Sequence, residues 1–175
     1  MARETERIVR IIEKTFDKHP WYGPSMMEVF KMDPEAAPAR MGKGHSIIEL
    51  VRHMTSWRIF AIKRLEGDFT FEIDEEINFP KPGTWDEALA ALVESQTALV
   101  HAVRNFPEDR FDELVPSKTQ KYTYYTLLHG IVHHDIYHLG QIKPIKLLQQ
   151  HDSCIITLIL IHHSECTTHH TCLVT

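Results

Sequence analysis

The sequence predicts an all-α four-helix bundle, and three observations carry that prediction. Four long segments have apolar residues at three- and four-residue spacing, which is typical of helices with one buried face. Two of these segments begin with a capping box, in which two side chains hydrogen-bond the free amides of a helix N-terminus. Residues 69–73 alternate apolar and polar side chains, but one strand cannot form a sheet. Amphipathic helices of this number pack as a bundle.

The first helix is expected at residues 4–18, where three isoleucines and a phenylalanine share one face. Gly23 and Pro24 follow its end and break the helical pattern. A long connection then runs to Gly44, with a short helical piece around residues 26–30. The chain therefore needs a long crossing between its first two long helices.

Capping boxes mark the beginning of the second and third helices. Ser46 with Glu49 opens the second helix, which is expected at residues 46–66. Thr84 with Glu87 opens the third helix, whose pattern stops ahead of the next proline. Both helix starts are thus predicted from side chains that satisfy backbone amides.

The fourth helix is expected at about residues 122–142. Pro144 lacks an amide hydrogen and its ring clashes with the carbonyl four residues earlier, so we expect the helix to kink or end near Lys143. Residues 1–149 then form one bundle domain. Residues 151–175 contain no lysine or arginine and are rich in histidine and cysteine, and we expect an atypical tail that is either disordered or an artefact.

Charge and cysteine usage exclude several classes of protein. A net charge of -5 and a pI near 6.2 disfavour a nucleic-acid groove or an anionic membrane surface, because both require a concentrated basic face. The first ten residues are too charged for a secretion signal, and no segment approaches the ~20 apolar residues of a membrane span. The three cysteines all lie beyond residue 153 and cannot cross-link the domain. We expect a cytoplasmic protein that binds neither nucleic acid nor a membrane.

Two pairs of histidines at four-residue spacing lie on the fourth helix, and helical geometry distinguishes them. His138 lies about 50° and His134 about 90° from the centre of the apolar face. His129 and His133 lie more than about 130° away. The pair His134 and His138 can therefore face the bundle interior, whereas the other pair faces outward.

A third histidine, His53, lies on the flank of the second helix beside its apolar face. Side chains on facing helices build metal sites inside bundles, and three neutral imidazoles suit zinc, nickel, iron or copper rather than calcium or magnesium. From spacing alone, partly buried histidines without a metal remain an equal alternative. Asp135 is expected either to accept a hydrogen bond from an imidazole or to pair with Arg52 or Arg58.

Two motifs resemble those of the DinB/YfiT-like superfamily. They are His-Ser-Ile-Ile-Glu-Leu-Val-Arg-His53 in the second helix and Gly130-Ile-Val-His-His-Asp-Ile-Tyr-His-Leu-Gly-Gln-Ile142 in the fourth. The resemblance covers about residues 4–149. It implies a four-helix bundle, a divalent metal on the matching His53, His134 and His138, and frequently a homodimer. Characterised relatives include thiol S-transferases and a thiol-dependent isomerase, and many members have no known activity.

The expected function is a metal-dependent thiol S-transferase with zinc or nickel as the metal and a small electrophile as the second substrate. A thiol that binds the open position of a metal held by three imidazoles ionises below its free pKa of about 8.5. A metal-dependent hydrolase is an alternative, although no base is evident from the spacing. A metal-binding stress or scaffold protein without turnover is another. A cavity beside the metal would favour an enzyme, and a fourth protein ligand would favour the scaffold.

Overall fold

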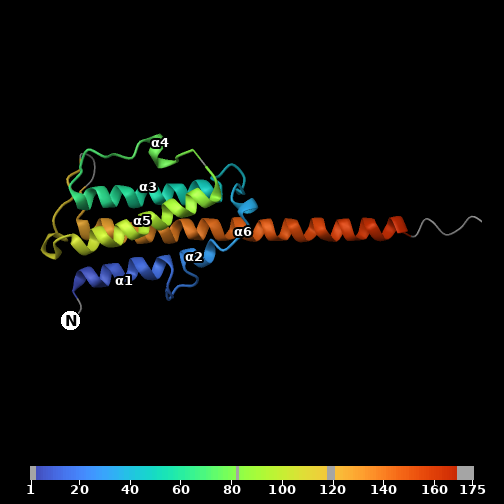
Figure 1. Ribbon diagram of the computed structural model, residues 1–175, viewed down its shortest axis with the longest axis horizontal. Coiled ribbons are helices and arrows are strands. Elements are labelled where there is room, and N and C mark those ends of the chain that lie inside the picture. Colours follow the sequence, from blue (N-terminus) through green and yellow to red (C-terminus); the bar gives the residue numbers. More distant parts are fainter. Residues whose placement is uncertain (1–2, 82, 118–120, 169–175) are drawn as a thin grey trace, which may run out of the picture.

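The computed structural model describes residues 3–81, 83–117 and 121–168, with side chains described as far as residue 149. Within these residues the chain is helical, and the expected all-α four-helix bundle is confirmed (Figure 1). No strand forms in the described ranges, where two isolated bridges are the only β-type pairings. The long helices are α1 (Glu4–Phe16), α3 (Ile47–Glu66), α5 (Trp85–Asn105) and α6 (Tyr124–Thr168), and short helices are α2 (Met26–Val29), α4 (Glu75–Asn78), η1 (Pro34–Ala36) and η2 (Glu108–Arg110).

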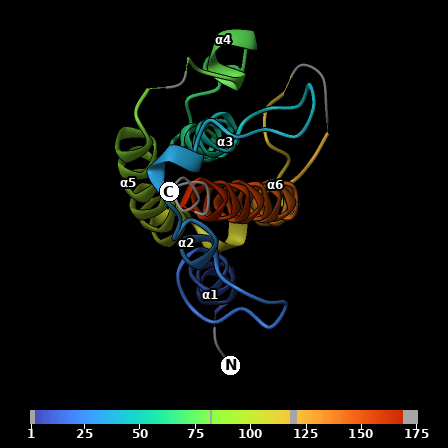
Figure 2. The ribbon, with the colours of Figure 1, turned by 90° about the vertical axis from the view of Figure 1, so that its right-hand side faces the viewer.

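The four long helices form a closed ring when the bundle is viewed along its axis (Figure 2). α3 packs against α5 and α6, and α1 packs against the same two helices from the opposite side. The chain reaches α3 through the long connection that contains α2, as expected from its prolines and glycines. This arrangement places α3 directly beside α6. These two helices carry the predicted metal ligands.

The helix ends follow the local chemistry of the sequence. Both predicted capping boxes are present, at Ser46 with Glu49 and at Thr84 with Glu87. Gly67 ends α3 in the left-handed region at φ 84°, where a side chain would be strained. Residues 69–73, which could have been extended, belong to neither a helix nor a strand.

The prediction that the fourth helix kinks or ends near Lys143 is wrong. α6 continues through Pro144 as far as Thr168, and its ribbon keeps one direction beyond the bundle (Figure 1). A proline removes only one helical hydrogen bond, and the Pro144 ring lies on the exposed side. Ile142 and Ile145 on either side of it are buried in the core and hold the helix in place.

The tail predicted at residues 151–175 falls partly within α6. Its backbone is helical as far as Thr168, and residues 169–175 lie outside the described part of the chain. Within the described residues, no helix has both the length and the apolar character needed to span a bilayer.

Candidate metal centre

Three histidine side chains meet between α3 and α6. The Nε2 atom of His134 lies 3.0 Å from that of His53 and 3.0 Å from that of His138. One ligand atom from each of the three lies within 4.8 Å of those of the other two. The convergence expected from the positions of these residues on their helices is therefore observed.

Helical spacing on α6 and the packing of α3 against α6 bring the three imidazole rings together. His134 and His138 are four residues apart on α6 and so lie on one face, one turn apart. His53 reaches them because α3 and α6 are packed neighbours. The outward pair also lies as predicted, with His133 exposed and His129 bonded to the backbone oxygen of Tyr125.

Hydrogen bonds on the far side of two rings turn their Nε2 atoms toward the shared centre. His53 Nδ1 donates to the backbone oxygen of Asn78 at 2.8 Å, and His138 Nδ1 donates to Oε1 of Gln141 at 2.7 Å. A neutral imidazole that donates through Nδ1 has a free electron pair on Nε2. These two contacts therefore select the tautomer that binds a metal through Nε2, as outer hydrogen bonds do in metal sites.

Burial keeps all three imidazoles neutral. It lowers the pKa of His53, whose Nδ1 contact with Asn78 opposes that change. Burial, followed by the neighbouring charges of His138, His53 and Arg58, lowers the pKa of His134 to about 3. Burial likewise lowers the pKa of His138. The neutral form is the one that binds a metal ion.

The two distances from His134 Nε2 to its neighbours fit the ligands of a transition-metal ion, and the whole set lies within 4.8 Å. Metal–nitrogen bonds of about 2.0–2.1 Å separate tetrahedral ligands by about 3.3 Å, close to the 3.0 Å found here. Without an ion, His134 Nε2 can donate to only one of its two neighbours, so the cluster is short of hydrogen bonds. Among the described residues the group contains no fourth histidine, cysteine or carboxylate, which leaves one side of the centre to another ligand.

The family of this chain follows from its similarity to known proteins. The model of the DinB superfamily matches residues 14–142, which include all three histidines. The chain belongs to the DinB superfamily. Its fold is similar to that of a protein from Streptococcus pneumoniae, with a TM-score of 0.65 and 16% identity over 83% of this chain and 92% of that chain. A DinB-like protein from Bacillus subtilis is also similar, at 16% identity, 83% and 85% coverage and a TM-score of 0.48. No curated protein matches the chain.

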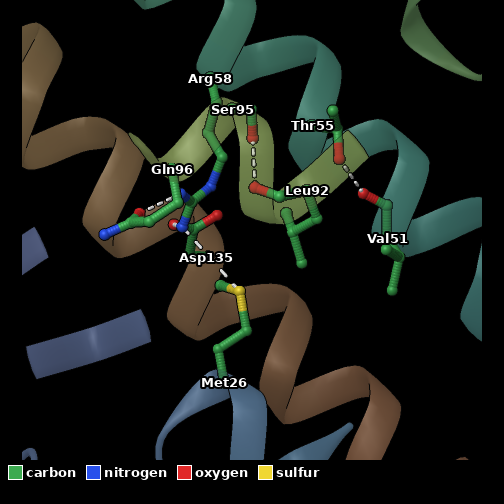
Figure 3. A network of polar contacts seen from close by, with 8 residues as sticks. All are labelled: Met26, Val51, Thr55, Arg58, Leu92, Ser95, Gln96 and Asp135. Carbon is green, nitrogen blue, oxygen red and sulfur yellow. Dashed lines mark hydrogen bonds and ion pairs between the residues drawn. The ribbon is translucent and has the colours of Figure 1, made fainter. Parts of the chain in front are cut away.

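In this DinB-superfamily chain, Asp135 contacts an arginine rather than an imidazole (Figure 3). Its Oδ2 lies 2.6 Å from Nη2 of Arg58, and both side chains are almost fully buried. Arg58 also donates to Gln96 on α5 and lies 5.3 Å from the centre of the Phe16 ring. Of the two expected roles, ion pairing with Arg58 is therefore observed. Burial raises the pKa of the Asp135 carboxyl, and the adjacent guanidinium opposes that change.

Aromatic rings cover one side of this DinB-type centre. Phe79, which follows α4, stacks on His53 with a centroid distance of 4.3 Å and on His45 with a distance of 3.7 Å. Trp57 lies 5.7 Å from the His134 ring, and its Nε1 donates to Oδ1 of Asn78 at 3.1 Å. The connection between α3 and α5 thus closes part of the site and fixes the orientation of His53.

A cleft of about 440 Å³ opens beside His134. Its walls come from α3, from the segment that follows α3, and from α6. A volume of this size accommodates a small organic molecule. The lining residues are Trp57, Phe60, Glu72, Ile73, Ser117, Tyr122, Thr126, Leu127, Gly130, Ile131 and His134.

Some residues that contact the three histidines were not predicted from the sequence. Asn78 and Phe79 follow α3 in a segment without helical periodicity, and Asn78 contributes a backbone atom, which no residue pattern reveals. Gln141 accepts a hydrogen bond from His138 through its Oε1. Its position three residues after His138 on the same helix was the available signal.

Proposed function

We propose that this DinB-superfamily protein is a metal-dependent thiol S-transferase that acts on a small electrophile. The observation that supports this proposal best is the position of the cleft. Three Nε2 atoms converge at its edge, one of them on a residue that also lines the cleft, and no fourth protein ligand in the described residues closes the centre. Zinc or nickel suits three neutral imidazoles.

A divalent ion held by these imidazoles would lower the pKa of a bound thiol and so supply a thiolate at neutral pH. In the reaction, the thiol proton passes to solvent and the sulfur forms a bond to the electrophilic carbon. The leaving group departs with the electron pair of the bond that breaks. No protein base is required for this sequence of steps.

The protein's own residues hold and orient the reactants. His53, His134 and His138 provide the ligand nitrogens, and Gln141 and the Asn78 carbonyl fix two of the rings. Preset rings reduce the reorganisation needed on binding. The aromatic walls of the cleft exclude water from the electrophile and place it next to His134.

The alternatives lack comparable support. A hydrolase requires a base beside the attacking water, and the carboxylate among the described cleft residues, Glu72, forms an ion pair with Arg64, with its Oε2 3.2 Å from Nη2. A scaffold protein would not need an open cleft at the ligand set. The transferase proposal therefore accounts for more of the site.

The first test is the metal content of protein purified without a metal-affinity tag. We expect about one zinc, nickel or similar ion per chain in the wild type and in His133→Ala, and no ion in His134→Ala. His133 is the matched control because it is the adjacent histidine on the same helix and is exposed. Absence of metal from the wild type, with no uptake of added zinc or nickel, would overturn the proposal.

The second test measures the chemistry. Metal-loaded protein is mixed with a panel of thiols and 1-chloro-2,4-dinitrobenzene, and formation of the thioether is followed by absorbance. We expect turnover in the wild type and in His133→Ala but not in His134→Ala. Bound metal without consumption of any thiol would contradict the transferase and leave a metal-binding role.

A further inference from the structure

We propose that the cleft beside His134 is the binding site of the electrophile, and that it selects a flat, apolar group without negative charge. This inference rests on the proposed function and specifies its second substrate. The thiol would occupy the open side of the centre, and the electrophile the cleft. Shape, charge and one glycine carry the argument.

The shape of the cleft suits an aromatic ring. Trp57 and Phe60 form one wall from α3, with ring centroids 5.4 Å apart in an edge-to-face arrangement. Leu127 and Ile131 line the cleft from α6. The Trp57 indole is held by its hydrogen bond to Asn78, so it offers a fixed surface. An added ring gains from edge-to-face and offset-stacked contacts with these rings as well as from the burial of its area.

The charges of the cleft disfavour an anion. Glu72 is the one acidic residue among the described lining residues, and neither lysine nor arginine is among them. The nearby Arg64 is buried. Its guanidinium donates a hydrogen bond to the backbone oxygen of Asp68 and forms an ion pair with the carboxylate of Glu72. In the metal-free protein, a carboxylate or sulfonate that entered the cleft would lose water and meet neither lysine nor arginine among the described lining residues. A neutral group avoids this cost.

Gly130 keeps the cleft open. It lies one turn from Thr126 and one turn from His134 on the same face of α6, and all three line the cleft. A Cβ atom built on Gly130 meets nothing within 4 Å. A larger side chain would lean toward the preceding turn, across the cleft wall formed by Thr126 and Leu127. Glycine is less favourable than alanine inside a helix, so the open space is maintained at the expense of stability.

Filling this space is the decisive experiment. Gly130→Leu places a side chain in the cleft, and Gly140→Leu is the matched control, because Gly140 lies on the same helix, is equally unobstructed and does not line the cleft. The probes are 1,3-dinitrobenzene, which is neutral and lacks a leaving group, and its anionic analogue 3,5-dinitrobenzoate. Binding of both is measured by ligand-observed NMR with metal-free and metal-loaded protein, beside metal content.

We expect 1,3-dinitrobenzene to bind the wild type and Gly140→Leu, and to bind Gly130→Leu at least about tenfold more weakly. We expect 3,5-dinitrobenzoate to bind the metal-free wild type at least about tenfold more weakly than the neutral probe. Metal content should be equal in all three proteins. Failure of the neutral probe to bind the wild type, equal binding by Gly130→Leu, or equal binding of the anion to the metal-free wild type would each overturn this inference.

These outcomes separate the two proposals. Loss of the cleft as a binding site, with metal still bound and thiols still consumed, would overturn the inference and leave the proposed function standing. Probe binding that obeys the expected order in a protein that takes up no metal would overturn the proposed function alone.

Discussion

At the scale of single residues, Arg58 and Asp135 form an ion pair inside the core. Both side chains have lost nearly all contact with water, and removal of charges from water costs several kcal/mol per ion. The pair joins α3 to α6 next to His134, so it fixes the same two helices that supply the metal ligands. Asp135 therefore contributes to the register of these helices rather than to the hydrogen bonds of the imidazoles.

Asp135→Asn should lower the free energy of unfolding by about 3–5 kcal/mol, because it leaves the Arg58 charge buried without a counter-ion. Urea unfolding monitored by circular dichroism measures this loss. The control is the double variant Arg58→Met with Asp135→Leu, which removes both charges and should recover most of the stability. A single variant as stable as the wild type would show that the pair does not carry this energy.

The beginning of α3 shows how a short motif places a long element. Glu49 accepts hydrogen bonds from the backbone amide and hydroxyl of Ser46 at 2.6 and 2.7 Å. These contacts satisfy donors that a helix N-terminus otherwise leaves free. Because His53 lies on the second turn of α3, the same motif also sets the beginning of the helix that carries a candidate ligand.

Glu49→Gln should destabilise the protein by about 0.3–1 kcal/mol at neutral pH. The Ser46 amide holds the pKa of Glu49 below its usual value of 4.5, so its stabilising effect is complete above that value. As pH falls below 4.5 and through the pKa of the folded state, the carboxylate is protonated and the effect is lost. Thermal unfolding of both proteins from pH 7 downward should therefore show a difference that begins to shrink below pH 4.5, and a difference that stays constant as the pH falls would contradict this account.

The whole molecule divides into a bundle and the distal part of α6. Among the residues whose side chains are described, as far as residue 149, the two hydrophobic clusters of the core contain no buried residue beyond Ile145. Beyond the bundle, the α6 ribbon projects away and no other described segment lies beside it (Figures 1 and 2). The bundle should therefore be stable without the distal segment.

A chain that ends at residue 149 should keep its metal content and unfold within about 1 kcal/mol of the full chain, since a helix without packed partners adds little stability. Calorimetry and elemental analysis of the two forms measure this. Loss of folding on truncation would contradict the single-domain assignment of residues 1–149. Sedimentation of both forms also tests the homodimer, which stays a prediction.

The sequence alone determined the four long helices and the positions of His53, His134 and His138, because helical period and capping motifs are local properties. The continuation of α6 through Pro144 depends on tertiary packing, since the buried side chains of Ile142 and Ile145 hold the helix in place on both sides of the proline. The Asn78 carbonyl on His53, the Arg58–Asp135 pair and the cleft beside His134 also required the folded structure. Each joins segments far apart in the sequence, and their distances depend on how the helices pack rather than on any residue pattern.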